Sequence, residues 1–158
     1  MSSSCLLDSF TEYVRDNRDA LERALGVEID NAHLLTARNL GGATIGLAWT
    51  GGMCDALGRS SAVEQSAFSS KAFVGTIVAH ELGHNLGMPH DAGGKYLMAP
   101  SASTGEPSGL ELQFSDQSRR SAENFLVKDY GRGWTSACLD PASRGAAVPS
   151  RHRRDSFP

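Results

Sequence analysis

The segment His80-Glu-Leu-Gly-His-Asn-Leu-Gly-Met-Pro-His90 decides how this 158-residue chain is interpreted. It overlaps the end of a stretch, Ser70 to Leu86, that is apolar nearly all round, which predicts a buried helix. Ser69 or Ser70 can cap this helix at its start, and Gly87 is the residue type that most often ends a helix in a left-handed conformation. Two of the histidines therefore lie on a predicted helix and the third lies just beyond it.

The spacing of the histidines brings their imidazoles together. His80 and His84 are four residues apart, so a helix places both rings on one face, about one turn from each other. His90 follows six residues later, which a continuing helix would not present on that face. A left-handed turn at Gly87 can bring it back as a third ligand. Glu81 lies beside the same face, where it can take a proton from a metal-bound water.

Three neutral imidazoles and one open position are the ligand set of a catalytic zinc ion, whereas a structural zinc site fills all four positions with protein ligands. The alternative is that an H-E-x-x-H sequence arises by chance and that its histidines are ordinary core or surface residues. The longer pattern fixes five positions over eleven residues, on a helix that stops in the right place, and this favours Zn²⁺.

The pattern resembles that of the metzincin zinc peptidases, in which the third histidine is followed by a methionine turn. Tyr96-Leu-Met-Ala-Pro100 is the candidate turn, with Met98 placed to lie beneath the metal. Asp91, directly after the third histidine, resembles the adamalysin (reprolysin) family, which includes the ADAM and snake-venom metalloproteinases. Pro100 differs from the tyrosine ligand of astacins and serralysins at that position.

This resemblance implies an α+β catalytic domain (α/β in the broad sense), with a partial mixed sheet packed on the active-site helix and a C-terminal helix. It also implies that Glu81 activates water bound to a zinc ion held by His80, His84 and His90, which makes the chain a zinc endopeptidase. In the family, an edge strand binds the substrate as an extended peptide by strand addition. The matching residues are Gly46, Leu47 and Ala48.

Patterning along the rest of the chain predicts its elements. Apolar residues recur with a helical period from Leu7 to Leu25, and Gly26 can end that helix. Two short strands are predicted, with a turn at Gly41-Gly42 between them, in the segments Asn31–Thr36 and Ala43–Thr50. The polar, serine-rich stretch Asp55–Ser70 predicts a loop, and the glycine-rich stretch Ala92–Gly109 after the third histidine predicts irregular structure. The last periodic segment, Ser115–Val127, predicts a helix capped by Ser115 or Asp116.

The three cysteines, Cys5, Cys54 and Cys138, are too far apart in sequence for a thiolate zinc site. Composition alone leaves one long-range disulfide with a spare thiol, or free buried thiols, as alternatives. The family resemblance implies a Cys54–Cys138 disulfide and leaves Cys5 unpaired. The chain departs from the family in lacking the usual cysteines between His90 and the methionine turn, and in carrying Gln117 where a cysteine is common.

Composition limits the partners. Lysine and arginine number 15 against 18 acidic residues, a formal net charge of −3, which gives no overall attraction to nucleic acid or to an anionic membrane. No stretch approaches the ~20 apolar residues of a membrane-spanning helix, and the first residues lack the basic and apolar regions of a signal peptide. The expected partner is a protein or peptide substrate, and the resemblance implies an extracellular or cell-surface location.

We expect a catalytic domain over residues 1–141 that lacks the family's usual N-terminal strands, and a basic tail over residues 142–158. The tail segment Arg151-His-Arg-Arg154 is interpreted either as part of a solvated end or as a basic processing site. A non-catalytic metalloproteinase-like fragment that acts as a binding or adhesion module is the alternative to the enzyme. The presence of Glu81 favours the enzyme.

Overall fold

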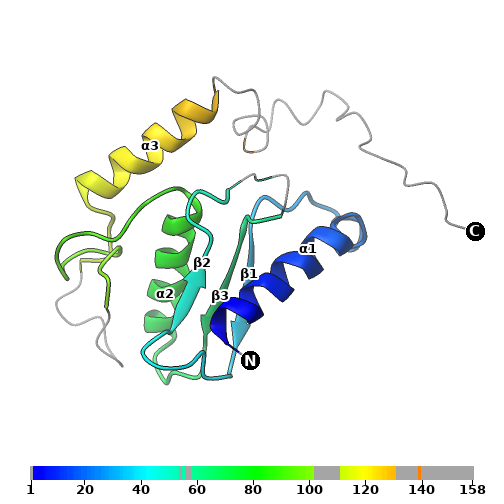
Figure 1. Ribbon diagram of the computed structural model, residues 1–158, viewed down its shortest axis with the longest axis horizontal. Helices are drawn as coiled ribbons and strands as arrows, with labels where there is room; N and C mark the ends of the chain where they lie inside the picture. The colour runs from blue at the N-terminus through cyan, green and yellow to red at the C-terminus, as the bar shows by residue number, and fades with distance from the viewer. Residues whose placement is uncertain (1, 54, 56–57, 102–110, 131–138, 140–158) are drawn as a thin grey trace, which may run out of the picture.

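The computed structural model describes residues 2–53, 55, 58–101, 111–130 and 139. Within this part of the chain, helices flank a small sheet on both sides (Figure 1). The elements follow in the order α1 (Ser3–Leu25), β1 (Ala32–Thr36), β2 (Gly46–Ala48), β3 (Ser61–Gln65), α2 (Lys71–Asn85) and α3 (Asp116–Tyr130). The predicted α+β architecture with a mixed sheet is confirmed.

The sheet has the strand order β1-β3-β2. β3 pairs parallel with β1, with Ala32 opposite Ser61, and antiparallel with β2, with Gly46 opposite Glu64. The predicted turn at Gly41-Gly42 exists, because both glycines have positive φ. The two strands that flank this turn are nevertheless not neighbours, since the later strand β3 inserts between them.

The prediction of a loop over Asp55–Ser70 was wrong, because this stretch contains the central strand of the sheet. In β3, Ser61, Ala62, Val63 and Glu64 are all buried, although serine and glutamate are more common at the surface. A strand buried on both faces shows no alternation of polar and apolar residues, so its polar side chains concealed it.

The two faces of the sheet are covered by different helices, α1 and α2 (Figure 1). On the α1 face, Leu7 packs with Leu40 and Val63 in an apolar core that Leu34 and Leu47 extend. Because side chains alternate along a strand, Ala62 and Glu64 on either side of Val63 point to the opposite face, toward α2. α3 lies apart from the sheet, where Ala122 packs with Met88 and Met98.

The predicted helices are confirmed with small shifts at their ends. α1 begins four residues earlier than expected, with Ser2 as its N-cap, and it ends at Gly26 in the left-handed conformation. α2 is capped by Ser70, whose side chain accepts a hydrogen bond from the Phe73 amide. Ser115 accepts a bond from the Ser118 amide and so caps α3 as predicted.

Several predictions fall on residues outside the described ranges. Cys54 and Cys138 are among them, so the disulfide between them stays a prediction, whereas Cys5 is a free and exposed cysteine. The tail over residues 142–158 also lies outside. Among the described residues, no helix combines the length and the apolar character needed to cross a membrane.

Candidate metal centre

A turn at the C-terminal end of α2 redirects the chain. Gly87 adopts φ 79°, its amide donates to the His84 carbonyl at 2.9 Å, and the Met88 amide donates to the Gly83 carbonyl at 2.9 Å. This pair of bonds is a Schellman motif, which ends a helix by reversing the direction of its backbone. The reversal returns His90 to the face of α2 that carries His84, as the position of the glycine predicted.

The three histidines meet at their Nε2 atoms. The Nε2 of His80 lies 3.1 Å from that of His84 and 3.1 Å from that of His90, and the last two are also 3.1 Å apart. No other group of three histidine, cysteine or acidic side chains among the described residues is arranged to hold a metal ion. The structure thus brings together all three histidines that the sequence pattern singled out.

The other ring nitrogens of two histidines are held by the backbone. His80 donates from Nδ1 to the Leu97 carbonyl at 2.6 Å, and His84 donates from Nδ1 to the Met88 carbonyl at 2.8 Å. Because a carbonyl oxygen only accepts, each Nδ1 carries the proton and each Nε2 presents a lone pair. Two lone pairs are therefore fixed toward one point, which is the arrangement of a metal site.

Burial keeps these imidazoles neutral. Burial, with a smaller contribution from the nearby His84 and His90, lowers the pKa of His80 to about 4. Burial also lowers the pKa of His84. Neutral rings at physiological pH are the form that binds a metal ion, so no proton has to be removed from them first.

Met98 lies directly against the turn of α2 that carries the histidines. It is fully buried, and a Cβ atom added to Gly83 would lie 2.5 Å from its sulfur atom. Gly83 therefore allows the methionine to pack against the helix between His80 and His84. The Ala99 amide closes the turn by donating to the Tyr96 carbonyl at 2.9 Å, as expected for the predicted methionine turn.

Asp91 connects the third histidine to two other segments. Its backbone amide donates to the Met98 carbonyl at 2.8 Å. Its Oδ1 atom accepts hydrogen bonds from the hydroxyl groups of Ser115 at 2.6 Å and Ser118 at 3.0 Å, at the start of α3. The residue after His90 thus joins the histidine to the methionine turn and to the last helix.

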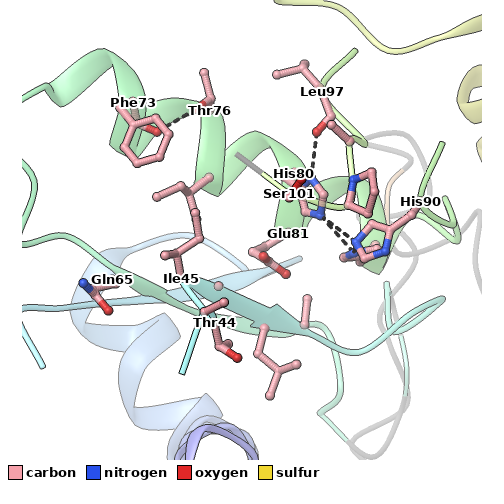
Figure 2. A pocket seen from close by; sticks show the side chains of 18 of the residues that line it. Thr44, Ile45, Gln65, Phe73, Thr76, His80, Glu81, His90, Leu97 and Ser101 are labelled. Atoms are coloured by element: carbon pink, nitrogen blue, oxygen red, sulfur yellow. Dashed lines mark hydrogen bonds between the residues drawn. The ribbon is translucent and has the colours of Figure 1, made fainter. Parts of the chain in front are cut away.

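Glu81 lies between α2 and β2 and lines a cavity of about 940 Å³, and the three histidines line the same cavity (Figure 2). Its side chain is 4% exposed, and burial together with the charge of nearby Glu64 raises its pKa to about 8. A carboxyl group whose pKa lies near neutrality can both accept and release a proton during a reaction. The rest of the cavity is largely apolar, with Ile45, Phe73, Ile77 and Leu97 in its lining.

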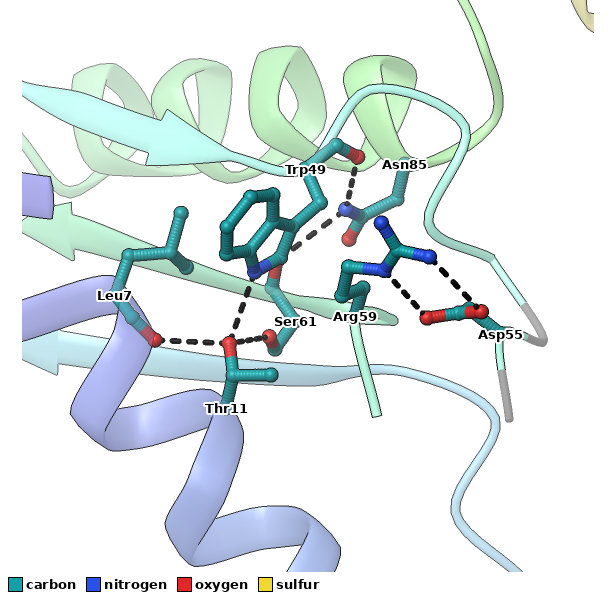
Figure 3. Close-up of polar contacts among 7 residues, drawn as sticks. All are labelled: Leu7, Thr11, Trp49, Asp55, Arg59, Ser61 and Asn85. Atoms are coloured by element: carbon teal, nitrogen blue, oxygen red, sulfur yellow. Dashed lines mark hydrogen bonds and ion pairs between the residues drawn. The ribbon is translucent and has the colours of Figure 1, made fainter. Parts of the chain in front are cut away.

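Asn85 joins the histidine-bearing helix to the strands (Figure 3). Its Nδ2 donates to the Trp49 carbonyl at 2.9 Å and to the Ser61 carbonyl at 3.2 Å, and its Oδ1 accepts from Asn31 at 2.7 Å. The Gly51 amide donates to the His84 carbonyl at 2.8 Å. These bonds hold the segment that follows β2 against the end of α2, so the edge strand keeps a fixed position beside the histidines.

Residues 2–139 match the model of the reprolysin (M12B) family of zinc metalloproteases. The chain belongs to this family. It is 43% identical over 129 residues to the snake venom metalloproteinase atroxlysin-1 of Bothrops atrox, an alignment that covers 78% of this chain and 59% of that protein. The chain therefore spans less than two thirds of the length of this relative.

The donor set fits the zinc ion that the family name implies. Three nitrogens bound tetrahedrally at the usual distance of ~2.0–2.1 Å lie about 3.3 Å from one another. The Nε2 atoms of this reprolysin chain are 3.1 Å apart, and two are oriented by Nδ1–H bonds to carbonyl groups. Three imidazoles without a fourth protein ligand are typical of a catalytic site.

Two residues near this centre, His33 and Glu64, could not be placed there from the sequence. His33 lies within the predicted strand Asn31–Thr36, and its Nδ1 forms a hydrogen bond with the buried carboxyl group of Glu64. Glu64 lay in the segment predicted to be a loop, so nothing placed it near Glu81. The signal in the sequence was that Glu64 follows a run of small and apolar residues, which indicates a buried acid, and a buried acid needs a hydrogen-bond or charge partner.

Proposed function

We propose that this chain is a zinc endopeptidase in which His80, His84 and His90 hold the metal. The observation that carries this proposal is the convergence of three Nε2 atoms, 3.1 Å apart, in a cavity that also contains the Glu81 carboxyl group. A zinc ion held there would supply Lewis acidity and lower the pKa of water. Among the described residues no fourth side chain joins the three histidines, and three protein ligands are the set of a catalytic rather than a structural zinc site.

Glu81 moves the proton in this proposal. Its carboxylate accepts a proton from the attacking water on an Oε atom and later gives the proton to the leaving amine of the cleaved peptide. Burial supports this role, because it raises the pKa of the carboxyl group to about 8 and so makes the protonated form accessible. A nearby cation would lower this pKa and allow the proton to be released again.

The substrate would bind as an extended strand along β2. Within the described residues β2 pairs only with β3, so its other edge can receive the backbone of a peptide at Gly46, Leu47 and Ala48. The Leu47 side chain packs into the α1 core, which leaves its backbone to make the contact. If the peptide runs antiparallel to β2, its part beyond the cleaved bond lies near Ile45, where the apolar lining of the cavity favours an apolar side chain.

The site of action and the domain boundary are also proposals. The relative is a venom protein by name, which supports an extracellular or cell-surface location for this chain. We assign residues 1–141 to the catalytic domain and residues 142–158 to a basic tail. Protein or peptide substrates are its expected partners.

The test compares wild-type protein with Glu81→Ala and with Glu123→Ala, an exposed glutamate on α3 as the matched control. We expect about one zinc ion per chain in all three by mass spectrometry, and cleavage of an unstructured protein by wild type and control alone. Chelation should abolish cleavage, and added zinc should restore it. Stoichiometric zinc with equal cleavage by wild type and Glu81→Ala would instead support a non-catalytic binding module.

A further inference from the structure

Gly46 is a glycine for a reason other than its backbone conformation. Among the described residues, six glycines have positive φ, and Gly46 is not among them. It lies at the start of β2, opposite Glu64 in the antiparallel pairing with β3. Any residue could adopt this backbone conformation, and an alanine in its place would ordinarily be neutral or slightly stabilising. The explanation must therefore come from what the missing side chain would touch.

Glu81 occupies the space above Gly46. A Cβ atom added to the glycine would lie 2.2 Å from Oε1, 2.8 Å from Cδ and 2.9 Å from Cγ of Glu81. The three nearest heavy atoms thus all belong to this one side chain, and all are closer than real Cβ contacts allow. Glu81 points from α2 onto the β2 ribbon, in agreement with this contact (Figure 2).

Packing, rather than hydrogen bonding, fixes one side of the carboxyl group. Its Oε2 atom is buried and receives no hydrogen bond from the described part of the chain. Glu64, which lies opposite Gly46 in the sheet, is fully buried and repels the charge of Glu81. The bare backbone at Gly46 therefore limits how close to β2 the carboxyl group can lie.

We propose that Gly46 is a positioning residue for Glu81: the absence of a side chain lets the carboxyl group rest on the backbone of the strand along which the substrate binds. This inference rests on the proposed function, since it assigns Glu81 the proton transfer. It adds that the strand which binds the peptide also sets the distance between the peptide and its proton acceptor. A methyl group at residue 46 would push the carboxyl group away from β2 toward the cavity.

The contact is tested by a double-mutant cycle of wild type, Gly46→Ala, Glu81→Ala and the double variant, each unfolded in urea with zinc present. With Glu81 in place, Gly46→Ala should lower the urea midpoint by less than about 1 M, because the displaced group is the end of a flexible side chain that can move toward the cavity. In the Glu81→Ala background, the same change should leave the midpoint unchanged or raise it slightly. If Gly46→Ala does not fold but the double variant folds as well as Glu81→Ala, the proposal is equally supported.

Activity gives the second measurement. We expect Gly46→Ala to keep its zinc and its KM within a few-fold while kcat falls about 100-fold, because an error of about 1 Å in a proton acceptor has that effect. Gly75→Ala is the matched control, since this exposed glycine lies on the same helix as Glu81 with nothing within 4 Å of an added Cβ. It should keep both kcat and zinc.

Two results would overturn the proposal. One is an equal loss of stability from Gly46→Ala in the wild-type and Glu81→Ala backgrounds, which would show that the glycine serves another contact. The other is a Gly46→Ala variant whose urea midpoint and kcat both equal those of the wild-type protein. If the wild-type chain cleaves no peptide, the proposed function fails, and the stability cycle still decides whether Gly46 positions Glu81.

Discussion

Buried polar groups on the two faces of the sheet differ in how completely they are hydrogen-bonded. On the α1 face, the Thr11 hydroxyl donates to the Leu7 carbonyl, shares a bond with Ser61 and accepts from the Trp49 ring, all at 2.8–2.9 Å (Figure 3). On the α2 face, Glu64 and Glu81 each keep one buried oxygen that no hydrogen bond from the described residues reaches.

This difference separates stability from chemistry. A buried hydroxyl group with all its bonds made adds to the stability of a fold, whereas a buried carboxyl group with an unpaired oxygen lowers it. Such unfavourable groups gather where a protein binds or reacts, because the same burial that destabilises them also shifts their pKa. The sheet thus has one face that secures the fold and one that carries the candidate site.

Loss of a histidine should have the largest effect, and it should be confined to the α2 face. We expect His84→Ala to remove zinc and cleavage together, because it deletes one of three metal ligands. The loss of zinc affinity should exceed the roughly 10–100-fold that follows removal of a ligand's hydrogen-bond partner. Titration with a competing chelator measures it, and His33→Gln, a histidine outside the cluster, should retain zinc.

The metal-free protein should show the unfavourable burial of Glu81 as a pH dependence. Its pKa is about 8 in the folded state, whereas an ordinary glutamate has a pKa of 4.5, so between these pH values the folded chain binds a proton that the unfolded chain has released. Its contribution to the free energy of unfolding therefore falls as pH rises. Relative to wild type, Glu81→Gln should gain about 4 kcal/mol between about pH 5 and about pH 9.

Urea unfolding in the presence of a chelator measures this difference, and a stability difference that does not change with pH would contradict it. Added zinc sharpens the test. A nearby cation favours the carboxylate, so the pH dependence should become smaller when the metal is bound.

On the α1 face, Thr11→Val should reduce stability without affecting the chemistry. It leaves the Trp49 ring nitrogen and the Ser61 hydroxyl group without their shared partner, which costs about 1–3 kcal/mol. We expect unchanged zinc content, and unchanged kcat at temperatures where the variant is folded. Ser121→Ala, which removes a partly exposed hydroxyl group from α3, is the control and should change stability by less than about 0.5 kcal/mol. A loss of zinc in Thr11→Val would show that the two faces are not independent.

The smallest expected effect is that of Glu64→Gln on the pKa of Glu81. Removing the neighbouring negative charge should lower this pKa, although burial, its main cause, remains. A carbon-detected NMR titration of the metal-free protein reports it directly. An unchanged or higher pKa would show that Glu64 does not act on Glu81 through its charge.

Prediction from the sequence was most complete for features that depend on contacts between residues close together in the sequence. Helix α2, its Ser70 cap, the turn at Gly87 and the meeting of His80, His84 and His90 all depend on contacts within about twenty residues, and fixed spacings encode them. β3 was missed because it is buried on both faces by elements that are distant in the sequence, and such a strand lacks the alternation of polar and apolar residues that marks a half-buried strand. The same non-local pairing brings Glu64 toward Glu81, so the contribution of Glu64 to the raised pKa could not be predicted either.

The bonds that orient His80 and His84 end on main-chain carbonyl groups, those of Leu97 and Met88. No amino-acid replacement at residues 88 or 97 deletes a carbonyl oxygen, so point mutations there leave both acceptors present. An insertion or deletion between the two residues, by contrast, would move the backbone itself. The ring orientation in this chain is thus tolerant of changes in residue type and sensitive to changes in loop length.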